Sequence, residues 1–371
     1  MKVLLVAGAR PNFMKVAPIA SALTARGATP VLVHTGQHYD PQMSDTFFKQ
    51  LCLQAPDFFL EVGSETHAVQ TARVMERFEP VLLETRPDWV VVVGDVNSTL
   101  GVSLVVSKRR EELGCGLAHV EAGLRSRDWR MPEEINRVVT DQLSDLLLTP
   151  SRDARENLLR EGIPAELIHF VGNVMIDTLL ACRDAACKLA MPTRLELGDD
   201  YVVATLHRPS NVDDPATLAV LLESLARIAE ERAVVLPLHP RTRARAREFG
   251  LESLLDRVRT TEPLGYLEML GLTDASSVVL TDSGGLQEET TALGVPCVTL
   301  REQTERPVTI THGTNRLAPW PPTVEGIVDA YHEAYSRRGQ PSATPEGWDG
   351  CAATRVVDAL FSIEPGARLR S

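Results

Sequence analysis

The stretch Thr281-Asp282-Ser283-Gly284-Gly285-Leu286-Gln287-Glu288-Glu289 decides how the rest of the sequence is interpreted. The apolar run 277–280 before it predicts a buried strand, and the apolar spacing over 286–293 predicts a helix. Glycines at such a turn leave backbone N–H groups open to a phosphate at the helix N-terminus. Glu289, about one and a half turns into the helix, could accept hydrogen bonds from the hydroxyls of a ribose. The stretch predicts nucleotide binding, although a tight turn capped by Ser283 explains it equally well.

Length and charge narrow the class of protein. A chain of 371 residues exceeds one ordinary core and predicts two domains. The net charge of −12 argues against a nucleic-acid partner, which needs a basic surface, but permits a local basic patch for a nucleotide. No apolar run approaches the roughly 20 residues of a membrane span. The six cysteines form no Cys-x-x-Cys pair. We therefore expect a cytoplasmic protein without a membrane or nucleic-acid partner.

Strand and helix patterns alternate along the whole chain. The expected strands are residues 3–7, 29–34, 89–93, 117–120, 146–149, 168–171, 201–206, 233–237, 278–281 and 297–300. The expected helices are residues 18–26, 44–52, 68–84, 100–108, 133–143, 174–189, 216–229, 241–249, 264–272, 286–293 and 324–337. Alternation with fully apolar strands indicates parallel, doubly wound sheets, and residues 191–193 look like a linker. The fold class is therefore α/β, with two Rossmann-like domains, 1–175 and 190–351, facing across a cleft.

Polar residues concentrate directly after the expected strands, at the end where such sheets bind ligands. A lone Asp95 after a strand is more often a turn or cap residue than a catalyst. Seven turns with charged or imidazole groups around one cleft instead favour an enzyme. These turns contain Arg10, His38, Asp95, Glu121, His207, His239 and Arg301.

Several other kinds of site have no motif in this sequence. The chain contains no Gly-x-Gly-x-x-Gly fingerprint, no P-loop, no His-Glu-x-x-His, no paired cysteine ligands and no Gly-x-Ser-x-Gly elbow. We therefore expect neither a cofactor nor a metal. The features that remain to define the function are a nucleotide-recognition stretch, several carboxylates and a well-placed histidine.

These stretches resemble the bacterial and archaeal UDP-N-acetylglucosamine 2-epimerase family, of the type that does not hydrolyse its product. The matching stretches are Gly8-Ala9-Arg10-Pro11 with Lys15, 35–38, Gly94-Asp95, 119–125, 132–137, Gly172-Asn173, His207-Arg208, 281–289, and 304–307 with Gly313-Thr314. The resemblance implies a glycosyltransferase-B-like architecture in which the C-terminal helix, 352–371, packs back onto the first domain. It also implies a homodimer.

The resemblance assigns a role to each matched residue. The residues implied for substrate binding are Arg10, Lys15, Arg125, Arg137, Ser283, Gly284, Gly285, Glu289 and Arg306. Of these, Ser283, Gly284, Gly285 and Arg306 would hold the diphosphate and Glu289 the ribose, while Arg10 and Lys15 would face the diphosphate from the other domain. The implied catalytic residues are Asp95, Glu121, Glu133 and His207. Glu133 also fits an ordinary first helical turn after Pro132, and His207 an ordinary turn.

The implied reaction inverts carbon 2 of the sugar in UDP-N-acetylglucosamine. That carbon bears no carbonyl, so its proton is scarcely acidic, and no nicotinamide motif supports oxidation. Elimination of UDP to a glycal, followed by re-addition, is the remaining route, and it requires carboxylates on two faces and cations at the diphosphate. Three alternative functions stay open: a hydrolysing relative that releases N-acetylmannosamine and UDP, a UDP-sugar transferase, and an inactive binder. The sequence also leaves open which carboxylate is the first base.

Two loops depart from the usual family pattern. His38-Tyr39-Asp40 stands where many members have His-Arg-Glu, and Pro209-Ser210 follows His207-Arg208 where many have Arg-Glu. In some bacterial members these loops bind a second, activating substrate molecule. We therefore expect no such allosteric site, and the substrate could be a further modified UDP-amino sugar.

Overall fold

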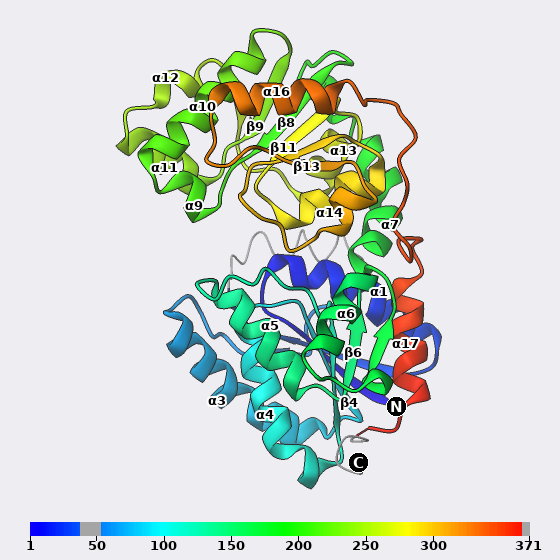
Figure 1. Cartoon of the computed structure of the whole chain (residues 1–371). Coiled ribbons are helices and arrows are strands. Elements are labelled where there is room, and N and C mark those ends of the chain that lie inside the picture. Colours follow the sequence, from blue (N-terminus) through cyan, green and yellow to red (C-terminus); the bar gives the residue numbers. More distant parts are fainter. Residues whose placement is uncertain (38–52, 366–371) are drawn as a thin grey trace. The chain divides into compact units, whose positions relative to one another are not determined.

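The computed structural model describes residues 1–37 and 53–365. It divides into two compact units. Unit 1 comprises Met1–Thr178 with Glu346–Ser371, and unit 2 comprises Leu179–Pro345. Each unit is a parallel β-sheet with helices packed against it (Figure 1). This architecture confirms the predicted α/β class with two Rossmann-like halves.

The described part of unit 1 forms a sheet of order β3-β2-β1-β4-β5-β6-β7, with all neighbours parallel. Its strands are β1 (Lys2–Ala7), β2 (Thr29–His34), β3 (Phe58–Phe59), β4 (Trp89–Val93), β5 (Gly116–Val120), β6 (Leu146–Thr149) and β7 (Ile168–Phe170). Its helices are α1 (Arg10–Ala25), α3 (His67–Thr85), α4 (Asn97–Leu113), α5 (Pro132–Leu143), α6 (Arg152–Arg160), a short η1 (Ala165–Leu167), the start of α7 (Val174–Lys188) and α17 (Ala352–Ser362). The strand order reverses between β1 and β4, the place where such sheets bind ligands.

Unit 2 repeats the plan with the order β10-β9-β8-β11-β12-β13. Its strands are β8 (Tyr201–Thr205), β9 (Ala233–Pro237), β10 (Arg259–Thr261), β11 (Val278–Thr281), β12 (Cys297–Thr299) and β13 (Asn315–Leu317). Besides the rest of α7, its helices are α8 (Met191–Arg194), α9 (Pro209–Val212), α10 (Pro215–Ala229), α11 (Pro240–Glu248), α12 (Glu252–Leu255), α13 (Tyr266–Asp274), α14 (Gly284–Leu293), α15 (Val308–Thr311) and α16 (Val324–Tyr335). Here the order reverses between β8 and β11.

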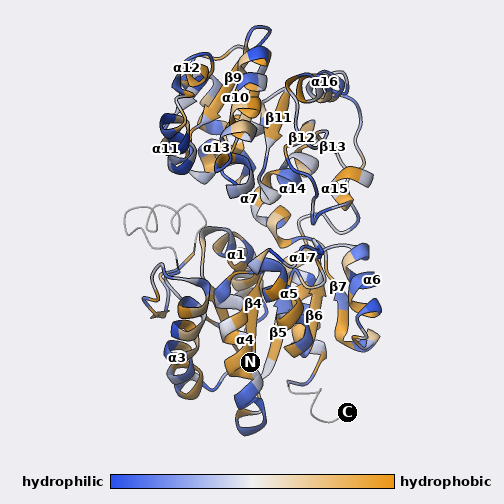
Figure 2. Cartoon of the chain, turned by 60° about the vertical axis from the view of Figure 1, so that its left-hand side comes forward, coloured by the Kyte–Doolittle hydropathy of each residue, from blue (hydrophilic) through white to orange (hydrophobic). Residues whose placement is uncertain are grey.

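The central strands owe their burial to their composition. β4 reads Trp-Val-Val-Val-Val and is buried along its whole length, as expected for a parallel strand covered on both faces. Figure 2 shows β4, β5 and β6 mainly in the hydrophobic colour, whereas α11 is almost entirely hydrophilic. Among the described residues, we find no helix with both the length and the apolar character needed to span a bilayer.

The structure extends or corrects several predicted elements. Helix α1 starts at Arg10 rather than at residue 18, because the Asn12 side chain accepts hydrogen bonds from the N–H groups of Gly8 and Ala9, each at 3.0 Å. The expected linker 191–193 is wrong, because Met191 is buried in the core of unit 2 and starts α8. The helix expected at 44–52 lies outside the described residues.

The strands that sequence analysis missed lie at sheet edges. β3, β10 and β13 are two or three residues long and end their sheets. β10 reads Arg-Thr-Thr, with none of the apolar run that marks a central strand. Edge strands are commonly short and polar, so periodicity does not reveal them.

Helix α17 completes unit 1 from the far end of the chain. It packs against α1, and Asp177 of α7 accepts hydrogen bonds from the first N–H groups of α17, those of Ala352 (3.1 Å) and Ala353 (2.7 Å). Asp177 therefore satisfies donors that a helix start leaves open.

Candidate active site

The predicted site residues fall into two groups, one in each unit. In unit 1 they follow the adjacent strands β1, β4 and β5 or belong to α5. In unit 2 they follow β8 and β11 or belong to the segment after β12. Both groups lie where the strand order reverses, as expected for ligand sites in doubly wound sheets.

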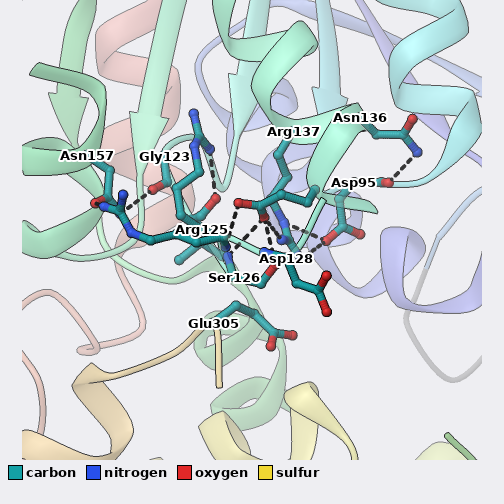
Figure 3. Close-up of polar contacts among 12 residues, drawn as sticks. Asp95, Gly123, Arg125, Ser126, Asp128, Asn136, Arg137, Asn157 and Glu305 are labelled. Carbon is teal, nitrogen blue, oxygen red and sulfur yellow. Dashed lines mark hydrogen bonds and ion pairs between the residues drawn. The ribbon is translucent and has the colours of Figure 1, made fainter. Parts of the chain in front are cut away.

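Asp95, which follows β4, is held by a bidentate contact with Arg137 of α5. Its Oδ2 lies 2.6 Å from one terminal nitrogen of Arg137 and 3.0 Å from Nε (Figure 3). The Arg137 side chain is almost fully buried and also pairs with Glu134 at 2.6 Å. Asn136 donates to the backbone carbonyl of Asp95 at 2.8 Å. Arg137, which was predicted to bind substrate, thus forms ion pairs with two carboxylates of unit 1.

Glu134 anchors the loop that precedes α5. It accepts from the N–H groups of Ser126 and Arg127 at 2.9 and 2.8 Å. Burial alone would raise the pKa of Glu134, but those two N–H groups and Arg137 outweigh it and hold the pKa below its usual value. Glu134 was missed in the sequence, although it stands beside the predicted Glu133.

Glu121, directly after β5, forms a buried ion pair with Lys15 of α1. Its backbone has φ +70°, in the left-handed region that residues other than glycine rarely adopt. Its Oε2 contacts the Lys15 ammonium, while Oε1 is buried and has no hydrogen-bond partner among the described residues. The unpaired oxygen therefore makes Glu121 a strong candidate for proton transfer.

A buried histidine connects the loops that carry these carboxylates. Nδ1 of His119 lies 2.6 Å from Oδ1 of Asp141, and Nε2 lies 2.9 Å from the carbonyl oxygen of Gly94. The other carboxylate oxygen of Asp141 accepts from the N–H of Gly123 at 3.1 Å and pairs with Arg125 at 2.7 Å. Burial would raise the pKa of Asp141, but His119 and Arg125 outweigh it and lower the pKa. Neither His119 nor Asp141 was predicted.

The remaining predicted residues of unit 1 are Arg125, Glu133 and Arg10. Arg125 forms ion pairs with Asp141 and, at 2.6 Å, with Glu161. Burial would lower the pKa of its guanidinium, but these two carboxylates outweigh burial and raise the pKa. Glu133 is half-buried in the first turn of α5 and has no ion-pair partner among the described residues. Arg10 begins α1, but its side chain lies outside the described part of the structure.

In unit 2 the N-terminus of α14 has the form expected of a phosphate site. Ser283 is the N-cap and accepts from the N–H of Leu286 at 3.5 Å. A Cβ on Gly285 would meet nothing closer than 4.0 Å, so this turn is open. A Cβ on Gly284 would come within 2.8 Å of the Arg306 guanidinium. Arg306 therefore lies directly beside the helix start, as the resemblance implies.

His207 follows β8 and pairs with the carboxylate after β11. Its Nδ1 lies 2.8 Å from Oδ1 of Asp282, whose Oδ2 accepts from the N–H groups of His207 and Arg208 at 2.9 Å each. Burial would raise the pKa of Asp282, but these contacts outweigh it and lower the pKa. The His207 side chain stays 38% exposed although Asp282 is fully buried.

Arg306 belongs to a cluster of alternating charges. It pairs with Glu288 at 2.9 Å and with Glu305 at 2.7 Å, and Glu305 also pairs with Arg301 at 2.9 Å. Arg208 lies 3.9 Å from Glu305 as well, so two buried glutamates meet three guanidiniums next to the α14 N-terminus. The sequence motif 304–307 contains part of this cluster, whereas the place of Glu288 and Arg301 in it was missed.

Glu289 is buried in α14. Desolvation, and then the neighbouring Glu288, raises its pKa to about 8. A neutral carboxyl at this depth can both donate and accept hydrogen bonds. In the described residues, no group of three or more His, Cys, Asp or Glu side chains is arranged to hold a metal ion.

Comparisons with known proteins identify the family. The family model described as UDP-N-acetylglucosamine 2-epimerase matches residues 21–361. A UDP-N-acetylglucosamine 2-epimerase of Methanococcus maripaludis is 42% identical, over 97% of this chain and 98% of its own. A UDP-2,3-diacetamido-2,3-dideoxy-D-glucuronate 2-epimerase of Pseudomonas aeruginosa is 45% identical, over 98% of this chain and 100% of its own.

Solved structures agree with these relatives. The crystal structure of Methanocaldococcus jannaschii UDP-GlcNAc 2-epimerase in complex with UDP-GlcNAc and UDP has a TM-score of 0.89 and 40% identity, covering 98% of this chain and 100% of that one. The enzyme from Neisseria meningitidis bound to UDP-GlcNAc has a TM-score of 0.85 and 28% identity, covering 98% and 100%. The chain belongs to the UDP-N-acetylglucosamine 2-epimerase family and is itself an epimerase.

Proposed function

We propose that this enzyme reversibly converts UDP-N-acetylglucosamine to UDP-N-acetylmannosamine by eliminating UDP and adding it back. The observation that carries the proposal is the pair of ion-paired carboxylates, Asp95 and Glu121, at the ends of neighbouring strands of unit 1. Lys15 and Arg137 lie against these two groups as counter-ions, and a carboxylate is the kind of group that removes a proton from carbon 2.

The chemical steps follow from the charges. A carboxylate takes the proton from carbon 2 while the bond between carbon 1 and the UDP oxygen breaks, and UDP leaves with the bonding electrons. The glycal then accepts a proton at carbon 2 on the opposite face, and UDP re-forms the bond to carbon 1. Two proton-transfer groups are required. The candidates are Asp95, Glu121 and Glu133, of which Glu133 has no ion-pair partner among the described residues.

We propose that the second domain, residues 190–351, binds the UDP moiety, while the first, residues 1–175 with the helix 352–371, acts on the sugar. The open N–H groups after Ser283, at Gly284 and Gly285, suit a diphosphate. In the ion pairs beside them, three guanidiniums, including that of Arg306, meet two carboxylates, which favours an anion there. Glu289 is assigned to the ribose. His207, oriented by Asp282, would stabilise the charge on departing UDP. Arg10 retains its predicted role at the diphosphate.

A second candidate substrate rests on the Pseudomonas aeruginosa relative. That protein is named for UDP-2,3-diacetamido-2,3-dideoxy-D-glucuronate and is 45% identical, slightly above the 42% of the Methanococcus maripaludis enzyme. Both sugars carry an acetamido group at carbon 2, where the same elimination applies. The divergent loops at Tyr39 and Pro209 are compatible with either, although Tyr39 lies outside the described residues.

The deciding experiment is a proton and phosphorus NMR time course in D2O with each UDP-sugar as sole substrate. Two interconverting UDP-sugars, with deuterium entering carbon 2, are expected. Accumulating UDP with free N-acetylmannosamine would identify a hydrolysing enzyme instead. No change with either sugar would overturn the proposal and favour a transferase that requires an acceptor.

We also propose that the enzyme is a cytoplasmic homodimer. The resemblance supports the dimer, and sedimentation velocity would test it. The described cysteines Cys115, Cys182, Cys187, Cys297 and Cys351 are all free thiols. Free thiols suit a reducing compartment, and fractionation of cells that express a tagged chain would test this.

A further inference from the structure

Lys15 and Glu121 form an enclosed pair within unit 1. Lys15 comes from the second turn of α1 and Glu121 from the turn after β5, and their side chains are only 9% and 4% exposed. The Lys15 ammonium contacts Oε2 of Glu121. Burying one of these charges alone would be costly, so each requires the other.

The backbone around the pair is shaped to accommodate it. Gly94 has φ +66°, and a Cβ at this position would lie 2.9 Å from Nζ of Lys15 and 3.6 Å from Oε2 of Glu121. Glu121 itself is in the left-handed region, which is strained for a residue with a side chain. Its N–H is fixed to the carbonyl of Leu148 at 3.1 Å. A strained backbone that is held in this way is typical of functional positions.

The two arginines near these loops form ion pairs with carboxylates other than Glu121. Arg137 pairs with Asp95 and Glu134, and Arg125 pairs with Asp141 and Glu161. Among the described residues, Lys15 is the cation that balances Glu121. An ammonium engaged with a buried carboxylate has little charge left for a diphosphate.

We propose that Lys15 is a positioning residue that pairs with Glu121 and occupies its Oε2, leaving Oε1 as the oxygen that exchanges the proton of carbon 2. This assignment rests on the proposed function and replaces the role at the diphosphate that the resemblance implies for Lys15. Oε1 is buried and has no partner among the described residues, as expected for an oxygen reserved for substrate.

The first test measures stability and needs no turnover. In Lys15→Met the Glu121 carboxylate is left buried and unpaired, and the melting temperature should fall on the order of 10 °C. The double variant K15M/E121Q, which removes both charges, should recover most of that loss. The exposed Lys108→Met of α4 is the matched control and should melt like the unaltered protein. If K15M does not fold at all, K15M/E121Q should still fold. A double variant that is no more stable than K15M would overturn the pairing.

The second test asks whether Lys15 acts as the counter-ion of Glu121 or as a ligand of the diphosphate. Calorimetric titration with UDP should give K15M a Kd within about threefold of the unaltered enzyme, whereas loss of a phosphate contact would weaken binding by tenfold or more. In turnover, K15M should lose kcat with little change in KM. A large rise in the Kd for UDP would overturn the assignment. If stability and UDP binding behave as expected but neither UDP-sugar is epimerised by the unaltered enzyme, the Lys15–Glu121 assignment stands and the proposed reaction fails.

Discussion

His119 donates a hydrogen bond from Nε2 to the carbonyl oxygen of Gly94 at 2.9 Å, immediately before Asp95. A carbonyl oxygen only accepts, so Nε2 carries a hydrogen. The same ring reaches Asp141 of α5 through Nδ1. His119 of β5 thus connects the turn after β4, which contains Asp95, with helix α5, which contains Glu133, and it stands two residues before Glu121.

Two replacements of His119 separate its two contacts. His119→Gln places an amide N–H near the position of Nε2 and can keep the bond to Gly94, whereas His119→Asn places it near Nδ1 and can keep only the bond to Asp141. If the bond to Gly94 orients Asp95, H119N should lose about 100-fold in kcat and H119Q much less. Steady-state kinetics with melting temperatures checks this, and the opposite ranking at equal stability would contradict it.

The bidentate contact between Arg137 and Asp95 predicts a distinct effect. Arg137→Lys keeps the charge but not the paired geometry, so kcat should fall by about 100-fold while the protein stays folded. Arg137→Met leaves Asp95 and Glu134 without their cation and should cost about 3–5 kcal/mol of stability. Kinetics and denaturant unfolding measure the two effects. A fully active R137K would show that the bidentate geometry is dispensable.

The open turn at Gly285 allows a test of phosphate binding that spares the fold. Gly285→Ala adds a methyl where nothing lies closer than 4.0 Å, in a helix where alanine is favoured over glycine by about 0.5–1 kcal/mol. The melting temperature should therefore hold or rise, while the Kd for UDP should increase by about tenfold or more because the methyl meets the diphosphate. The exposed Gly198→Ala, which also meets nothing within 4 Å, is the control. Unchanged UDP binding in G285A would argue against a diphosphate at this turn.

The raised pKa of Glu289 makes stability depend on pH. Desolvation, and then Glu288, raises the pKa from 4.5 to about 8, so between these values the folded protein holds a proton that the unfolded chain releases. Stability therefore falls as pH rises through this window. Glu289→Gln removes that dependence, so the variant should lose less melting temperature between pH 5 and pH 8.5 than the unaltered protein.

The exposed Glu302→Gln of the same unit provides the baseline for this comparison. Its melting temperature should follow that of the unaltered protein across the range. Parallel curves for E289Q and the unaltered protein would show that Glu289 titrates as it does in the unfolded chain.

The sheets were predictable because their central strands are continuous apolar runs. β4, β6 and β11 have the predicted bounds and are buried along their whole length, as expected for parallel strands covered on both faces. Helix α5 shows the limit of this logic. Its buried side includes Glu134, Arg137 and Asp141, whereas Ile135 is exposed. Hydrophobic periodicity alone cannot tell that a polar face turns inward.

The places of the candidate residues in the fold were more predictable than their pairings. The strand-to-helix turn lies where expected, at Ser283, Gly284 and Gly285, because neighbouring residues alone determine its local geometry. The pairing of Lys15 with Glu121 joins positions 106 residues apart, and that of His119 with Asp141 joins α5 to β5. Such long-range pairs depend on packing and could not be derived from motif spacing.

The capping of α17 by Asp177 has a consequence for biosynthesis. Unit 1 needs residues 346–362 for its last helix, yet these are translated after all of unit 2. The apolar side of α17, which includes Val356, Val357 and Leu360, covers part of α1. Domains generally fold in the order of synthesis. Here we expect part of the surface of α1 to remain uncovered until translation ends, whereas all of unit 2 is synthesised earlier.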